Sequence, residues 1–141
     1  MKDLPIAAGL VALSLALIAV AVFGLGDRDT FVSPPEAVAE EFIRSVGHGR
    51  VEPARELLAS EEERITSTQA MRTFAARFRS RVGHLDHVDV TVDERGQDSA
   101  EVRVDAKGSR ARMELTVPLA FQRGVWKVAR LSEVKRAVDQ R

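Results

Sequence analysis

The residues best suited to bind a metal ion are the three histidines of this chain. His84 and His87 are three residues apart at the start of a strand-like segment, and this spacing places two side chains on opposite faces of a strand. Side chains on opposite faces cannot both ligate one metal ion. His48 lies between Gly47 and Gly49, a composition typical of a turn. The sequence therefore predicts no metal site, and we expect His48 to be a loop residue.

Carboxylates are the other groups that could do chemistry, as general acids or bases. Acid–base catalysis needs a carboxylate in a sheltered concavity, where burial can move its pKa toward neutrality. Asp89, Asp105 and Glu114 are out of phase with the apolar residues around them, so we expect them on the solvent face. Neither a Ser/His/Asp pattern nor a glycine-rich phosphate loop has a suitable context, and the chain has no cysteine. The sequence therefore predicts no catalytic residue and no cofactor.

The segments that carry these carboxylates alternate apolar and polar residues with a period of two, which predicts β-strands. Gly96, Gly108 and Gly124 each lie between two such segments, as expected for the turns of an antiparallel meander. A fourth strand is predicted from Val125 to Leu131. The inward residues of the first three strands are expected to be Val88, Val90 and Val92; Ala100, Val102, Val104 and Ala106; and Ala111, Met113, Leu115, Val117, Leu119 and Phe121.

The outward charges suggest a register for these strands. If Val90 faces Val102 and Val104 faces Met113, the apolar residues stay on one face of the sheet. Opposite charges then meet across the strands, which predicts a charged ladder on the solvent face. The two rows of this ladder are Asp89–Arg103–Glu114 and His87–Asp105–Arg112.

Before the strands, apolar residues recur at spacings of three and four, which predicts three helices. The first begins after Ser33 and ends at Gly47, the second spans 51–59, and the third runs from 66–68 to Val82. The acidic run 61–63 is expected to be a solvated loop. Four arginines of the third helix, at positions 72, 77, 79 and 81, form either a solvated face or a surface for an anionic partner.

Residues 6–25 carry no charge and one polar side chain, Ser14, which predicts a transmembrane helix. Lys2 in the flank 1–5 favours an orientation with the C-terminal part outside the cytoplasm. A cleaved secretory signal is the alternative, because the segment Ala19-Val20-Ala21 has the small-x-small pattern of a cleavage site. In both cases the rest of the chain lies outside the cytoplasm, at the cell membrane or secreted.

After the linker 26–32, the remaining residues are enough for one compact domain, predicted over 33–131, with a tail or short helix over 132–141. Three helices with one apolar stripe each can cover the apolar face of a curved four-stranded meander, so the predicted fold class is α+β. The chain has 21 basic and 21 acidic residues. This balance argues against nucleic acid as a partner.

The last strands break the alternation, because apolar residues lie on their outward side as well. Monomers rarely leave such a surface bare. A protein partner or a second copy of the chain is the favoured cover, and the alternative is a C-terminal helix carrying Val134 and Val138. The candidate interaction surface consists of Pro118, Ala120, Val125, Ala129 and Leu131.

Three sequence segments resemble the nuclear transport factor 2-like superfamily, particularly its small bacterial membrane-anchored or secreted members similar to lumazine-binding domains. They are Pro35-Glu36-Ala37-Val38, Val117-Pro118-Leu119 and Gly124-Val125-Trp126-Lys127-Val128. The resemblance covers roughly 33–131 and implies a cone-shaped α+β fold. Enzymes of that superfamily, such as ketosteroid isomerase, use a cavity carboxylate with a tyrosine, and this chain has no tyrosine.

We therefore expect a non-enzymatic extracytoplasmic domain, anchored in the membrane, that binds a partner protein or a small ligand. The first alternative is a small isomerase- or dehydratase-type enzyme that uses an acid on a loop or helix. The second, which rests on the resemblance, is a subunit of an envelope transport or secretion assembly.

Overall fold

The structure is a computed structural model that describes residues 32–140. The predicted membrane segment 6–25 and its flank 1–5 lie outside the described residues. Among residues 32–140, no helix combines the length and the apolar character that crossing a bilayer requires. A compact unit begins at Ser33.

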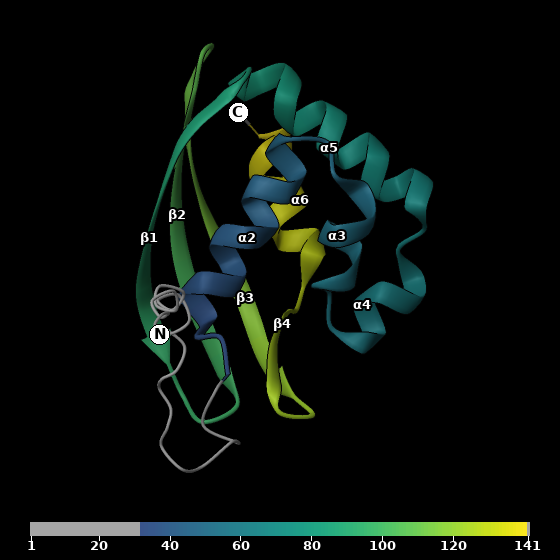
Figure 1. Ribbon diagram of the computed structural model, residues 1–141, viewed down its shortest axis with the longest axis vertical. Helices are drawn as coiled ribbons and strands as arrows, with labels where there is room; N and C mark the ends of the chain where they lie inside the picture. The colour runs from purple at the N-terminus through teal and green to yellow at the C-terminus, as the bar shows by residue number, and fades with distance from the viewer. Residues whose placement is uncertain (1–31, 141) are drawn as a thin grey trace, which may run out of the picture. The chain divides into compact units, whose positions relative to one another are not determined.

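Residues 32–140 form an α+β domain in which helices cover one face of a sheet (Figure 1). This agrees with the fold class predicted from the sequence. The elements in chain order are α2 (Pro35–Gly47), α3 (Val51–Glu56), α4 (Ser60–Ile65), α5 (Thr68–Val82), β1 (Leu85–Arg95), β2 (Ser99–Gly108), β3 (Arg112–Gln122), β4 (Val125–Val128) and α6 (Leu131–Asp139).

The four strands form an antiparallel meander in the order β1-β2-β3-β4, as predicted. β4 is short and pairs only with the end of β3, from Leu119 to Gln122. The parallel bridge between Leu58 and Val128 explains why α3 ends at Glu56 and not at Ala59 as expected, because the following residues run along the edge of β4.

The space between the helices and the sheet is filled by apolar side chains. Phe42 from α2, Phe78 from α5 and Leu115 from β3 are each no more than 1% exposed. The predicted inward residues of β2 and β3 lie in this core, except Ala111 before β3 and Phe121 near its end, which are more exposed. The interior of the cone is therefore a packed core.

The predicted register is wrong by two residues in both hairpins. Val90 pairs with Val104, and Val104 pairs with Leu115. A shift of two residues keeps every side chain on its face, so the apolar pattern cannot distinguish the two registers. The pairing of β1 with β2 is also irregular between Val92 and Glu94, where the register changes.

Because of this shift, like charges lie directly opposite each other on the outer face of the sheet. Asp89 faces Asp105, which faces Glu114. Along β2 the sign of the outward charges alternates from Glu101 to Lys107, so side chains of opposite charge meet between neighbouring cross-strand rows. The ion pairs are His87–Asp89 at 3.1 Å, Arg112–Asp105 at 3.1 Å, Arg103–Asp93 at 3.4 Å and Arg103–Glu114 at 3.6 Å.

The acidic run 61–63 is part of α4 and not a loop. Carboxylates in a first turn interact favourably with the helix dipole. The carbonyl oxygens of Glu63 and Thr66 accept hydrogen bonds from Arg55 of α3, at 3.1 and 2.8 Å. These bonds satisfy carbonyls that a helix end leaves without partners.

The C-terminal segment is an integral part of the domain. Leu131, Val134 and Val138 of α6 are at most 2% exposed. The helix packs along β3, beyond the residues that pair with β4, and against α5. Of the two alternatives expected for 132–141, a tail or a short helix, the helix is therefore present, and it begins one residue earlier, at Leu131.

Candidate functional site

The structure does not bring the five residues of the candidate interaction surface together on one exposed face. Val125 is 43% exposed and Ala120 is half-buried, whereas Leu131 is 2% exposed and belongs to the core. Pro118 is also buried, and its carbonyl oxygen accepts a hydrogen bond from the backbone N–H of Ala129 at 2.8 Å. The apolar character of this part of the chain is thus largely explained by packing within the domain.

His48 lies in the turn after α2, as predicted, and among the three histidines only His84 is placed differently from the sequence-based expectation. His87 lies on the outer face of β1 beside Asp89, whereas His84 precedes the strand. The ring of His84 lies 6.4 Å from that of His48, measured between centroids. Within residues 32–140, no cluster of three or more potential metal ligands occurs.

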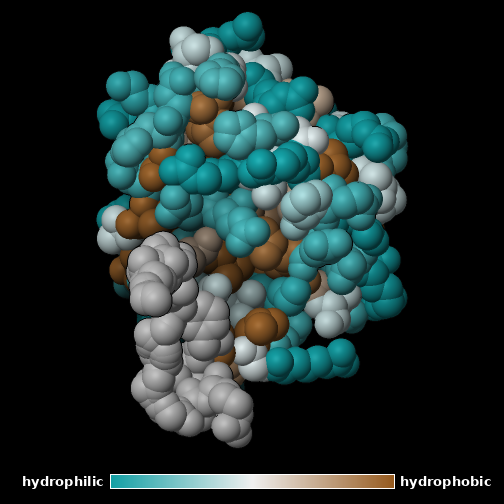
Figure 2. All heavy atoms as spheres, viewed as in Figure 1, coloured by the Kyte–Doolittle hydropathy of each residue, from teal (hydrophilic) through white to brown (hydrophobic). Residues whose placement is uncertain are grey.

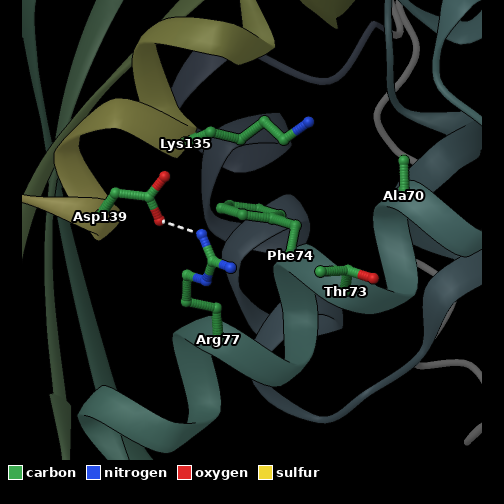
Figure 3. A pocket seen from close by; sticks show the side chains of 6 residues that line it. All are labelled: Ala70, Thr73, Phe74, Arg77, Lys135 and Asp139. Carbon is green, nitrogen blue, oxygen red and sulfur yellow. Dashed lines mark hydrogen bonds and ion pairs between the residues drawn. The ribbon is translucent and has the colours of Figure 1, made fainter.

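A recess between α5 and α6 is a candidate site for binding (Figure 3). We call it the α5–α6 groove. Its volume is about 290 Å³. Its position depends on the start of α5, where the Ser67 hydroxyl accepts a hydrogen bond from the Ala70 N–H at 3.0 Å. The residues that line it are Ala70, Thr73, Phe74, Arg77, Lys135 and Asp139.

Phe74 gives the groove an apolar floor. Its side chain is 3% exposed and stacks on Phe42 of α2, with ring centroids 6.5 Å apart and an angle of 22° between the planes. An aromatic pair of this geometry contributes about 0.5–1.5 kcal/mol beyond the burial of its area. The floor is therefore a rigid part of the core.

Charged groups line the walls of the groove. Arg77 donates a hydrogen bond to the Asp139 carboxylate at 2.8 Å, and Arg81 donates one to the Asp139 backbone carbonyl at 3.1 Å. Figure 3 shows the Lys135 side chain extending across the groove from α6, with its ammonium group directed away from Asp139. In the described part of the chain, no carboxylate lies within 4.0 Å of that ammonium group.

This arrangement suits binding better than acid–base chemistry. An apolar floor beside an ammonium group that has no carboxylate partner among residues 32–140 can hold an apolar side chain next to a carboxylate. Asp139 itself is engaged by Arg77. Sequence reasoning placed Phe74 and Arg77 on one helix but missed Lys135 and Asp139. Their spacing of four residues, which places two side chains on one face of a helix, was the available signal.

No protein-family model matches the sequence, and no curated protein matches it. Among solved structures, a Campylobacter jejuni protein described as an NTF2-like transpeptidase is similar, with a TM-score of 0.57 and 21% sequence identity. The match covers 69% of this chain and 98% of that one. The domain therefore has the nuclear transport factor 2-like fold, as the sequence resemblance implied, and at this identity the likeness concerns the fold alone.

Proposed function

We propose that this chain is a non-enzymatic binding domain, anchored in the membrane by residues 6–25 and lying outside the cytoplasm, that binds a partner protein through the α5–α6 groove. The uncharged stretch in the sequence supports the anchor. The packed core carries the non-enzymatic part of the proposal. Phe42, Phe78 and Leu115 fill the space between the helices and the sheet, where an enzyme of this shape would need a pocket with a polar catalytic group.

The chemistry of the groove indicates the kind of segment it would accept. Lys135, which pairs with no carboxylate in the described part of the chain, offers a cation above the apolar floor formed by Phe74. A short partner segment with an apolar side chain and a nearby carboxylate would satisfy both. Charge-assisted hydrogen bonds to a carboxylate are stronger than neutral ones, so Lys135 would contribute both affinity and orientation.

A site-specific cross-linking experiment tests this proposal. A photoreactive amino acid replaces Thr73, an exposed residue at the groove, in the full chain within native membranes. We expect one partner adduct, which Lys135→Glu abolishes by reversing the charge that the partner reads. Lys107→Glu is the matched control, because Lys107 is an exposed lysine on the outer face of the sheet.

Two results would contradict the proposal. Equal loss of the adduct in both charge variants would mean that net charge, and not the groove, determines the contact. Absence of any adduct at position 73 would mean that the groove is not an interface.

A further inference from the structure

The four arginines of α5 are not equivalent. Arg72, Arg77 and Arg81 each have a polar partner in Gln69, the Asp139 carboxylate or the Asp139 carbonyl. Over residues 32–140, Arg79 is the one arginine of this helix with no hydrogen-bond or ion-pair partner. As far as residues 32–140 are concerned, its guanidinium group is therefore available to a ligand.

Arg79 borders a hollow where the C-terminal ends of α2 and α5 meet. We call it the two-histidine hollow, because His48 and His84 line it with their rings 6.4 Å apart and inclined at 63°. Its volume is about 600 Å³, and its lining is mainly polar. The remaining lining residues are Gly47, Gly49 and Gly83.

Glycine at position 49 allows the guanidinium group to lie close to the backbone. Gly49 has φ +74°, a conformation that residues with a side chain rarely adopt. A Cβ atom there would lie 2.9 Å from Arg79 Nη1. The turn after α2 thus leaves space for the cation, and His48 of the same turn lines the hollow with it.

Cationic side chains are common near helix C-termini because of the helix dipole, so charge alone would identify no site. Here, however, backbone N–H groups already satisfy the terminal carbonyls. The Ser45 carbonyl accepts from the Arg50 N–H at 2.8 Å, and the Val82 carbonyl accepts from the Arg110 N–H at 2.8 Å. The carbonyl of Arg79 itself accepts from the Gly83 N–H at 2.7 Å.

No carboxylate in the described range pairs with Arg79, His48 or His84. A guanidinium group can donate two parallel hydrogen bonds to an oxyanion, and an imidazole donates at least one more. We propose that the two-histidine hollow binds a phosphate group, with Arg79 as its main donor and His48 and His84 on either side. The group belongs either to free phosphate or to the headgroup of an anionic lipid.

Imidazole NMR on the full chain in non-ionic detergent micelles tests the proposal directly. The chain has three histidines, so isotope labelling of histidine gives three signals. His87 is an internal control, because it lies on the outer face of β1 and interacts with Asp89. The ligands are inorganic phosphate and, in a second arm, short-chain phosphatidylglycerol added to the micelles.

We expect the His48 and His84 signals to shift together and saturably while that of His87 stays fixed. Arg79→Gln should weaken this binding by about tenfold or more, because it removes a charge-assisted bidentate donor. Arg72→Gln, on the same helix, should leave it unchanged. An unchanged His87 signal in both variants shows that the fold is retained.

The two arms identify the source of the phosphate group. Saturation by inorganic phosphate alone assigns a free ligand, and saturation by phosphatidylglycerol assigns a headgroup. Parallel shifts of all three histidines, no shift in either arm, or equal affinity after Arg79→Gln would each overturn the proposal.

Discussion

Two phenylalanines of α5 differ in a way that makes their replacement by alanine a quantitative test of the packing. Phe78 is fully buried, and Phe74 is 3% exposed at the floor of the α5–α6 groove. Replacing a buried phenylalanine by alanine costs about 3–5 kcal/mol, of which part is due to the cavity left behind. At position 74 that cavity opens into the groove and can admit water, which lowers its cost. We expect about 3 kcal/mol for Phe74→Ala and about 5 kcal/mol for Phe78→Ala.

Urea denaturation of a fragment covering 33–141 measures both values. The single tryptophan, Trp126, is 5% exposed and lies 5.2 Å from the ring of Phe121, so its fluorescence should change on unfolding. With a slope of about 1–3 kcal/mol per molar urea, Phe74→Ala should lower the midpoint by about 1–3 M. A loss below about 1 kcal/mol at Phe74 would mean that α5 presents another face to the core. A larger loss at Phe74 than at Phe78 would refute the argument that the groove relieves the cavity cost.

Three further predictions concern the N-terminal segment and the C-terminal part of the chain. The full-length protein should remain with membranes through an alkaline carbonate wash, because residues 6–25 are long enough to span a bilayer; release of a soluble form that begins near Val22 would instead indicate signal cleavage. Leu131→Glu should unfold the fragment 33–141, because it would bury an unpaired carboxylate. The half-buried Ala129→Glu should leave the fragment folded and, if the sheet forms a homodimer, make it monomeric in sedimentation experiments. Folded Leu131→Glu protein would show that this side chain lies at a surface.

The sequence predicted the elements and their buried faces well, because both depend on periodicities of nearby residues. The third predicted helix illustrates this. Its cap was predicted within 66–68 and is Ser67, its end at Val82 is as predicted, and Phe74 and Phe78 point inward as expected. The inward face of β2 was also predicted correctly, because its apolar residues, such as Val102, alternate with charged ones.

What the sequence could not give depends on residues far apart in the chain. The register requires knowing where the pairing of β1 and β2 is interrupted, and no residue type marks the irregularity after Val92. The candidate sites were missed for the same reason, because each is formed by residues that are far apart in the sequence. His48 and His84 lie at the ends of two different helices, and Lys135 comes close to Phe74 only because α6 packs against α5. Local sequence patterns do not show which residues far apart in the chain come into contact.

The edge of β3 is exposed during synthesis until α6 has been made. β4 pairs with β3 only from Leu119 to Gln122, and α6 packs along the remainder of that strand. Residues 131–139 leave the ribosome after β3, so for a time the strand presents unpaired backbone groups to other chains. Exposed strand edges of this kind promote association between nascent molecules. A chain that stalls or is cleaved before Leu131 should therefore aggregate while its first helices and strands are already formed.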